Sequence, residues 1–304
     1  LKYENRMLSG SKSTPYVKIS EGCDNHCAYC AIPLIRGRFR SREFEEIIKE
    51  CRKLVSEGAK EINLIGQDTT RYGTDLSEGK LLGDLMEEIT KIEGVFLVRA
   101  LYLYPDEITD RLLETMRDNP KIAKYFDIPI QHISASVLKR MNRRGDETFL
   151  KDLFAKIRSM MPEAIFRTTL IVGFPGESEA DFQKLLAFIT EFPFHRLGAF
   201  TYSREEDTKA YSYPDQIPEA TSQDRYDRLM KQQKKIAKKL NRAEIGKHHQ
   251  VLVEAYDPES GFYYGRSYAF APDDIDGYIV FQSKERLALG DIALVLIKEA
   301  IGYD

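Results

Sequence analysis

Several features are missing from this 304-residue chain, and each absence excludes a class of protein. No apolar stretch approaches the roughly 20 residues that cross a bilayer, and no secretory signal peptide is recognisable. Four cysteines are too few for the disulfide scaffold of a small secreted protein. An excess of one charge is also lacking, since 45 basic residues face 48 acidic ones, and a 42% hydrophobic content excludes a disordered chain. We expect a cytoplasmic globular protein without a membrane partner.

The length is consistent with about two domains. The chain opens at Leu1 rather than at methionine, which suggests that it was cut from a longer protein. We interpret residues 1–14 as a residual linker from a missing N-terminal domain.

Strand-like and helix-like segments alternate through the first two hundred residues. Helical periodicity begins after Ser41, which we expect to cap the first helix, and recurs at 81–92, 109–119, 137–141, 149–161 and 180–192. Strands are expected at 16–21, 61–66, 96–103, 125–130, 166–172 and 197–202. Six such βα units predict an α/β domain over 15–221 with a parallel sheet, either a partial barrel or a doubly wound sheet. Chemistry then belongs at the C-terminal ends of the strands.

The pattern changes after a polar linker at 203–221. A long connecting helix is predicted over 222–245, and short aromatic or β-branched strands separated by turns follow at 246–304. The last segment predicts a small all-β barrel of the OB-like kind.

Three of the four cysteines lie within eight residues, directly after the first strand. Cys23, Cys27 and Cys30 have the spacing Cx3Cx2C, and thiolate triplets suit an iron–sulfur cluster or zinc. Zinc requires a fourth ligand, and His26 lies too close within the same tight loop to complete a tetrahedron without strain. Three thiolates on a [4Fe–4S] cluster leave one iron open. Cys51, by contrast, lies on the apolar stripe of a helix and is expected in the core.

A Cx3Cx2C loop after the first strand of a partial βα barrel resembles the radical S-adenosylmethionine (SAM) superfamily. In that superfamily SAM chelates the open iron, and one electron cleaves it to methionine and a 5′-deoxyadenosyl radical. The resemblance implies that Cys23, Cys27 and Cys30 ligate the cluster and that Tyr29 packs near the adenine. It also implies that Gln67 and Asp68 meet the methionyl amino group.

Further polar or glycine-containing segments end other strands of the predicted barrel. Gln131-His132 follows the fourth strand and Gly173-Phe174-Pro175-Gly176-Glu177 the fifth. Their shared position predicts that Gln131 and Gly173 line the SAM pocket, whereas His132 alone is more typical of a hydrogen-bonded strand-end histidine. Arg167, on the fifth strand, is a further candidate if its side chain points into the barrel.

Several motifs narrow the resemblance to the radical SAM methylthiotransferases. They are Ser20-Glu21-Gly22-Cys23, Ile35-Arg36-Gly37-Arg38, Leu64-Ile65-Gly66-Gln67-Asp68, Ile128-Pro129-Ile130-Gln131 and Ile171-Val172-Gly173-Phe174-Pro175-Gly176-Glu177. That family appends a small β-barrel, TRAM, here at 246–304, and carries a second [4Fe–4S] cluster on an N-terminal domain. It uses one SAM for the methyl group, another for the radical, and a low-potential electron donor such as ferredoxin or flavodoxin.

Two substrate classes divide this family, an adenosine of tRNA and an aspartate of the small-subunit ribosomal protein S-twelve. Tyr102-Leu103-Tyr104-Pro105 and Gln131-His132-Ile133-Ser134 resemble the ribosomal-protein branch, whose members add sulfur and a methyl group at the aspartate β-carbon. The resemblance therefore makes S-twelve the expected substrate. A tRNA adenosine methylthiotransferase is the alternative, and a non-catalytic metal-binding protein a more distant one.

Charge supports the protein substrate. Residues 245–304 hold ten acids against five bases, a net charge of −5, which is poorly suited to RNA but attractive to a basic ribosomal protein. The turn with Asp273, Asp274 and Asp276 is expected to be an exposed part of this acidic surface. A run of cations over 231–242 without an acid is the counter-evidence, although such runs are more often solvated helix faces.

Overall fold

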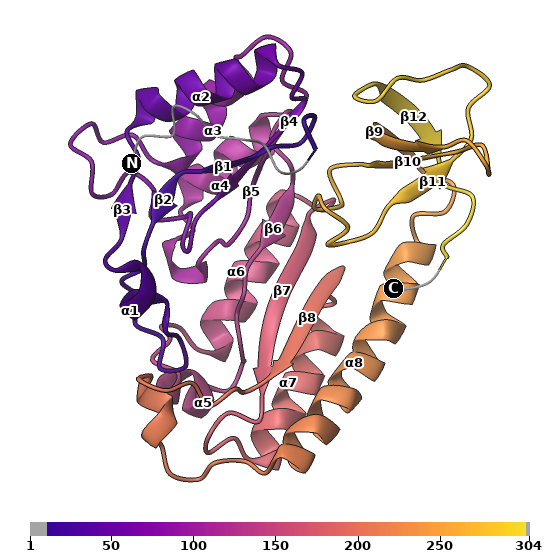
Figure 1. The fold of residues 1–304 in the computed structure, drawn as a ribbon. Helices are drawn as coiled ribbons and strands as arrows, with labels where there is room; N and C mark the ends of the chain where they lie inside the picture. Colours follow the sequence, from indigo (N-terminus) through magenta and orange to yellow (C-terminus); the bar gives the residue numbers. More distant parts are fainter. Residues whose placement is uncertain (1–10, 302–304) are drawn as a thin grey trace.

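The computed structural model describes residues 11–301, and six parallel strands form the centre of its larger part. Two three-stranded ladders, β1-β4-β5 and β6-β7-β8, are joined by the parallel bridge of Val98 to Ile122 and by a Leu103 N–H bond to the Asp127 carbonyl (2.8 Å) (Figure 1). The strands are β1 (Tyr16–Lys18), β4 (Glu61–Ile65), β5 (Leu97–Ala100), β6 (Tyr125–Asp127), β7 (Ile165–Val172) and β8 (Arg196–Thr201). The predicted partial barrel of six βα units is confirmed.

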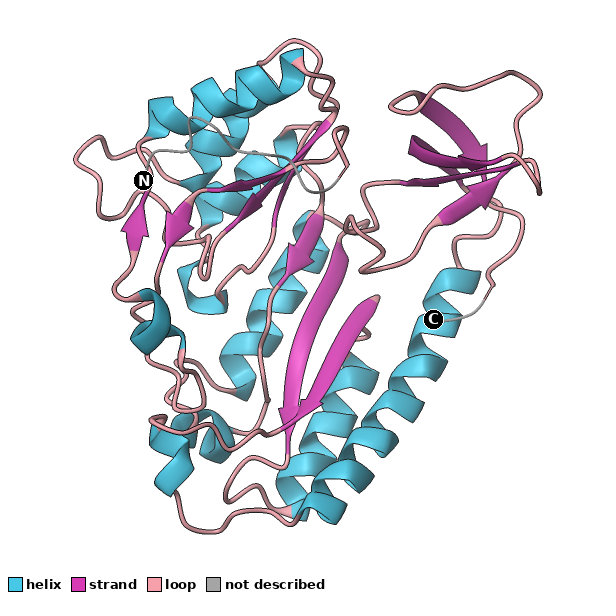
Figure 2. Cartoon of the chain, viewed as in Figure 1, coloured by secondary structure: helices cyan, strands magenta, loops and turns pink. Residues whose placement is uncertain are grey.

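Amphipathic helices cover the outer face of these strands (Figure 2). In α2 (Phe44–Ser56), the apolar residues recur on one face, and Phe44, Ile47, Ile48, Cys51 and Leu54 are buried. Cys51 is therefore a core residue, as expected. The other helices around the strands are α3 (Leu82–Thr90), α4 (Asp110–Asp118), α5 (Ala135–Arg140), α6 (Glu147–Met160) and α7 (Glu179–Glu191).

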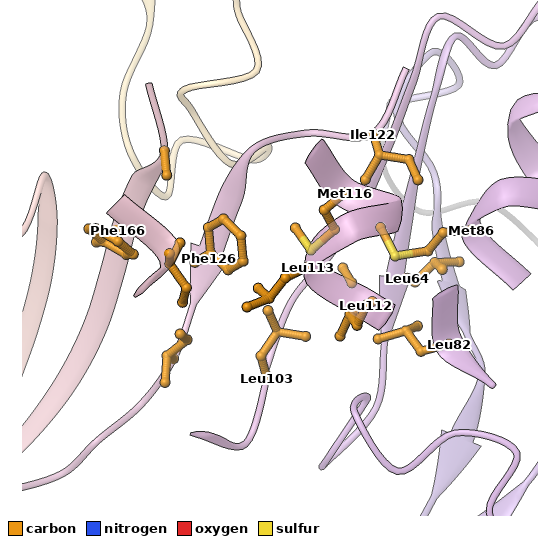
Figure 3. Close-up of a cluster of buried hydrophobic side chains, with 14 of the residues drawn as sticks. Leu64, Leu82, Met86, Leu103, Leu112, Leu113, Met116, Ile122, Phe126 and Phe166 are labelled. Atoms are coloured by element: carbon orange, nitrogen blue, oxygen red, sulfur yellow. The ribbon is translucent and has the colours of Figure 1, made fainter. Parts of the chain in front are cut away.

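The main core lies between the strands and these helices. Figure 3 shows Leu64 and Leu103 from the strand side facing Met86 of α3 and Leu113 of α4. Thr109 accepts a hydrogen bond from the Leu112 amide (3.2 Å) and thereby caps α4, so that its apolar face is presented to the strands.

Two local expectations near the cysteine loop were wrong. Ser41 does not cap α2, which begins after Glu43; instead β3 (Arg40–Ser41) pairs antiparallel with β2 (Ser20–Glu21). The chain thus returns across the start of the cysteine loop before entering the helix. A short helix that was not predicted, α1 (Ile32–Arg36), follows the loop. Most of the linker expected over 1–14 lies outside the described residues.

One long helix, α8 (Glu219–Arg242), connects the two parts of the molecule. It packs against β8 through Leu229, Gln233 and Ala237, and the Gln233 amide donates to the Phe194 carbonyl (2.9 Å). The cations of the 231–242 run lie on its exposed side. Before it, a 3-10 turn (Lys209–Ser212) interrupts the polar linker.

The C-terminal module is a curled antiparallel sheet of order β11-β10-β9-β12. Its strands are β9 (His248–Asp257), β10 (Phe262–Arg266), β11 (Ile279–Phe281) and β12 (Ile292–Leu296). Val251, Tyr263, Phe281 and Val295 form its small core. At Gly265 any side chain would collide with the Leu252 carbonyl, and the register of β10 shifts there to bend the sheet.

The module docks at the N-terminal ends of the barrel strands. Ala269 and Ala271 pack with Leu97, Tyr125 and Ile165 in a second apolar cluster. Because the chemistry of a parallel barrel lies at the C-terminal strand ends, the module occupies the opposite end.

Buried ion pairs fasten this contact. Arg266 of the module bonds Glu61 of β4 (2.8 Å) and Glu254 of β9 (2.6 Å), and Arg99 also bonds Glu61 (2.8 Å). Burial alone would raise the pKa of Glu61, but the two guanidinium groups hold it below its usual value.

The expectation of an exposed acidic turn was wrong for Asp276. Its side chain is only 2% exposed, accepts hydrogen bonds from the Tyr125 hydroxyl (2.5 Å) and the Ala271 amide (2.8 Å), and faces Arg196 at 3.8 Å. Asp273 and Asp274 are exposed, as expected. The turn is thus partly an anchor, and its third carboxylate adds nothing to a surface that would attract a basic protein.

No helix within residues 11–301 is long and apolar enough to span a membrane.

Candidate iron–sulfur and SAM site

The cysteine loop connects β2 to α1 at the C-terminal end of the first barrel strand (Figure 1). Cys23, Cys27 and Cys30 are partly exposed free thiols. Three backbone hydrogen bonds shape the loop: Cys23 to the Gly37 carbonyl (3.2 Å), Cys30 to the Cys27 carbonyl (3.0 Å) and Ala28 to the Met141 carbonyl (2.8 Å). The structure therefore presents all three thiols from one short, hydrogen-bonded segment.

A buried arginine contacts the middle cysteine. Arg143 Nη1 lies 3.6 Å from Cys27 Sγ and 3.4 Å from the Tyr29 hydroxyl, and its guanidinium stacks 4.3 Å over the Tyr104 ring. The Tyr104 hydroxyl is itself 3.9 Å from Cys27 Sγ. The guanidinium thus places a hydrogen-bond donor and a positive charge directly beside the Cys27 sulfur. The sequence analysis missed Arg143, because only the fold brings it to a residue 116 positions away.

Burial makes the two outer thiols harder to ionise. It raises the pKa of both Cys23 and Cys30 above the usual value. Neither thiol therefore ionises readily by itself, and a bound metal would have to displace the proton.

The donor set fits a [4Fe–4S] cluster. Within the described residues, no three His, Cys, Asp or Glu side chains are gathered around one point as a single metal ion requires. In a cubane each thiolate binds a different iron atom, so the sulfur atoms stand apart. Soft thiolate ligands on one loop, with one iron left free of cysteine, suit such a cluster.

Gln67 and Asp68, at the end of β4, hold the cysteine loop. Gln67 Oε1 accepts a hydrogen bond from the Gly22 amide (2.8 Å), and Asp68 Oδ2 accepts one from Asn25 Nδ2 (2.8 Å). Asp68 is fully buried, and this burial raises its pKa. The structure thus brings both predicted residues to the loop, where their visible contacts position its backbone.

Tyr29 belongs to the loop, and Gln131 lies at the C-terminal end of the neighbouring β6 extension. Gln131 ends the extension of β6 with a left-handed φ of 69°, and its buried Oε1 has no hydrogen-bond partner among the described residues. Tyr29 packs edge-on against Phe174 with ring centroids 6.4 Å apart, and burial raises its pKa. An unsatisfied buried acceptor at the C-terminal end of a strand is what a site for a polar ligand would contain.

The glycine at position 173 is explained by packing against α8. Its φ is 74°, and any side chain would collide with Ser222 of α8. Glu177 accepts hydrogen bonds from the Gly173 and Phe174 amides, so this loop is closed upon itself. Packing of α8 therefore already requires glycine at this position.

The structure does not bring Arg167 to the cysteine loop. It lies near the start of β7, bonds Asp127 Oδ1 (2.7 Å) and faces Asp276 of the module (3.9 Å). His132 is fully buried, and its Nδ1 accepts a hydrogen bond from the Ser134 amide (3.0 Å), as expected of a strand-end histidine.

A cleft of about 1760 Å³ lies elsewhere, between α8, β8 and the C-terminal module. Met230 and Leu240 line it from the helix, and Val280 and Leu294 line it from the module. None of the cysteines borders it.

Two family descriptions match the chain. Residues 17–189 match the radical SAM superfamily and residues 245–304 match the TRAM domain. The superfamily uses a [4Fe–4S] cluster and SAM, in agreement with the donor set of the cysteine loop.

Among solved structures, the radical SAM methyltransferase TsrM from Kitasatospora setae shares the fold with a TM-score of 0.50, 13% identity, and coverage of 61% of this chain and 36% of that one. Methylornithine synthase (PylB) gives a TM-score of 0.50 at 14% identity, with 72% and 62% of the chains covered. These similarities concern the fold alone.

Several curated proteins are similar over nearly the whole chain, all described as "ribosomal protein uS12 methylthiotransferase RimO". The protein from Clostridium botulinum (strain Eklund 17B / Type B) is 46% identical over 99% of this chain and 67% of its own length. Those from Alkaliphilus oremlandii and Geobacter sulfurreducens are each 48% identical, over 100% and 98% of this chain and 69% and 67% of their own lengths. The chain thus spans about two thirds of these relatives, and it belongs to the RimO family of radical SAM methylthiotransferases.

Proposed function

We propose that this chain carries the radical SAM reaction centre of an enzyme that adds sulfur and a methyl group to the β-carbon of an aspartate in ribosomal protein uS12, the S-twelve protein of the sequence analysis. The observation that carries the proposal is the three-cysteine loop at the C-terminal end of a parallel barrel, with the buried guanidinium of Arg143 at 3.6 Å from Cys27 Sγ. The names of the RimO relatives supply the substrate.

The residues of the loop have separate tasks. Cys23, Cys27 and Cys30 would hold the cluster, and Arg143 fixes Cys27 and offsets the negative charge of its thiolate. Gln67 and Asp68 keep the loop backbone in place through Gly22 and Asn25. When bound, the cluster supplies the electron that cleaves SAM.

We assign the SAM pocket to the same end of the barrel. Tyr29 and Gln131 offer an aromatic edge and an unpaired amide oxygen there, while Gln67, Asp68 and Gly173 shape the backbone around them. Arg167 is left outside this pocket, because its guanidinium is bonded to Asp127 near the start of β7 and faces Asp276 of the module.

The proposal includes partners outside the chain. A low-potential donor such as ferredoxin or flavodoxin would supply electrons, and a second cluster would come from an N-terminal domain within the remaining third of the relatives' length. A ribosomal substrate places the reaction in the cytoplasm, and we propose that tRNA is not a substrate.

Mass spectrometry of both substrate classes tests the proposal. The test uses a longer form of the enzyme that covers the full length of its relatives, with its clusters reconstituted. It is incubated with SAM, reductant, purified uS12 and bulk tRNA. We expect uS12 to gain the mass of a methylthio group at an aspartate. Modification of tRNA adenosine with unchanged uS12 would refute the assignment.

A further inference from the structure

Tyr102 stands out at the C-terminal end of β5. Every other residue from Leu97 to Pro105 is buried, whereas the Tyr102 side chain is 45% exposed. Its backbone has a φ of 61°, in the left-handed region that non-glycine residues with large side chains rarely adopt. Within residues 11–301 its hydroxyl has no hydrogen-bond partner, so nothing described explains the side chain's position.

The backbone of Tyr102 is held in this conformation from both sides. Its amide donates to Asp127 Oδ2 (2.9 Å), and its carbonyl accepts from the Thr69 amide (3.2 Å). Thr69 Oγ1 also donates to the Leu101 carbonyl (2.7 Å). Asp127 is itself buried and fixed by Arg167. Two neighbouring strands thus impose a conformation that tyrosine would not choose by itself.

Positive φ angles also occur in and beside the cysteine loop. Among the described residues, eight besides glycine have a positive φ, and four of these are aspartates in other loops, a residue that tolerates it. The other four are His26, Tyr102, Gln131 and Asn142. His26 belongs to the cysteine loop, and Asn142 Nδ2 donates to its carbonyl (2.9 Å). Strained residues that surrounding structure maintains are found preferentially at functional sites.

Tyr102 is also close to the chemistry. Tyr104, two residues further along, has its hydroxyl 3.9 Å from Cys27 Sγ. Thr69, whose amide bonds the Tyr102 carbonyl, directly follows Asp68, which accepts a hydrogen bond from Asn25 of the cysteine loop (2.8 Å). Ala100 and Leu103 on either side pack into the core beneath the helices, and Leu101 packs with the module-facing cluster. The Tyr102 ring belongs to neither cluster and remains available at the rim of the site.

We propose that Tyr102 is a specificity-determining residue whose ring contacts a cationic side chain beside the target aspartate of the substrate. The inference rests on the proposed function, because it takes the substrate to be a basic ribosomal protein. An exposed aromatic face attracts Lys or Arg within about 6 Å of its centroid, and rigid aromatic side chains dominate binding energy in protein interfaces. The imposed backbone conformation fixes the direction in which the side chain leaves the chain, so binding requires no rearrangement of the backbone.

Binding of fluorescently labelled uS12 to the cluster-reconstituted protein tests this role. Tyr102→Asn keeps a residue that tolerates a positive φ, and we expect it to raise the Kd about tenfold while iron content and Tm stay at the parent's values. Tyr102→Phe retains the ring and should bind within about threefold of the parent. Phe149→Asn, at a 36% exposed ring on the outer helix α6, is the matched control and should leave the Kd unchanged.

The outcomes distinguish the proposed Tyr102 contact from the proposed uS12 substrate. Parent-like binding by Tyr102→Asn, or a loss in Tyr102→Phe as large as that in Tyr102→Asn, would overturn the ring contact while leaving uS12 as the substrate. A parent protein that binds tRNA and not uS12 would remove the proposed function itself. If Tyr102→Asn loses iron or Tm, Tyr102→Gly replaces it, since glycine adopts this φ freely, and parent-like binding by that variant is equally fatal.

Discussion

The two ends of the barrel treat polar groups in opposite ways. At the module end, Arg266 bonds both Glu61 and Glu254, and Asp276 accepts two hydrogen bonds beside two arginines. At the cysteine end, Gln131 Oε1 is buried without a partner among the described residues, and three thiols carry no ligand of their own within the chain.

This difference separates a structural end from a reactive end. At the module end the carboxylates of Glu61, Glu254 and Asp276 all face arginines, which favours one arrangement of the two domains, because an unpaired buried charge there would be costly. At the cysteine end, the unpaired Gln131 acceptor and the left-handed backbone of Tyr102 are costs that the surrounding structure maintains, as is typical of functional sites. The predictions below test whether the two ends respond to substitution in these different ways.

The largest effect is expected at the cysteine end and concerns cofactor binding. Cys27→Ala removes one of three thiolates and the partner of Arg143, so the reconstituted protein should lose its iron and its brown chromophore near 400 nm. Cys51→Ala is the control, since Cys51 is a fully buried core residue of α2 and should retain iron. A full cluster in Cys27→Ala would contradict the ligand assignment.

At the module end, Arg266→Met should lower stability by about 3 kcal/mol, because it leaves Glu254 without its buried partner and Glu61 with Arg99 alone. Urea unfolding followed by circular dichroism measures this change. Arg286→Met, at an exposed arginine of the same module, should stay within about 0.5 kcal/mol of the parent. Equal losses in both variants would show that the ion-pair network does not fasten the module.

Asp276→Asn should cost less, about 1–2 kcal/mol, because the amide oxygen can keep both hydrogen bonds that Oδ2 accepts, but the neutral side chain no longer balances Arg167 and Arg196. The neighbouring exposed Asp274→Asn provides a matched comparison and should be nearly neutral. Thermal unfolding of the two variants side by side decides the point. A neutral Asp276→Asn would restore the interpretation of this turn as surface acid.

Local patterns in the sequence were sufficient for most of the fold. The apolar spacing of α2 identifies a helix, and the β-branched run of β7 identifies a strand. Both can be read from the sequence because each pattern lies within a single element. The cysteine loop was equally local, since its three thiols fall within eight residues.

The remaining features depend on contacts between distant segments. Arg143 lies 116 residues from Cys27, and Asp276 lies 151 residues from Tyr125. In sequence, Asp273-Asp274-Ile275-Asp276-Gly277 is indistinguishable from an exposed turn, and only docking of the module buries its third acid. The left-handed φ of Tyr102 likewise results from bonds to Asp127 and Thr69 on neighbouring segments.

The smallest expected effect is a pH dependence of stability at the module end. The Nδ1 of His195 accepts a hydrogen bond from the Phe166 amide (3.1 Å), and burial, with Arg158 and Arg196 nearby, lowers the pKa of His195 to about 3. Its folded pKa thus lies below the unfolded value near 6.5, so between these values the unfolded chain binds more protons and stability falls as the pH falls.

Between pH 6.5 and pH 5.5 we expect the parent to lose about 1 kcal/mol more stability than His195→Gln. Glutamine can accept the same amide hydrogen bond, but it does not titrate. Urea unfolding at these two pH values, in the parent and in the variant, isolates the histidine from the carboxylates that both proteins share. His249→Gln is the control, since that ring lies 3.0 Å from a Glu244 carboxylate oxygen rather than near two arginines. If the parent and His195→Gln lose the same stability on acidification, His195 is not held neutral in the folded protein. The surroundings of His195 would then be more open to water than those of Arg266.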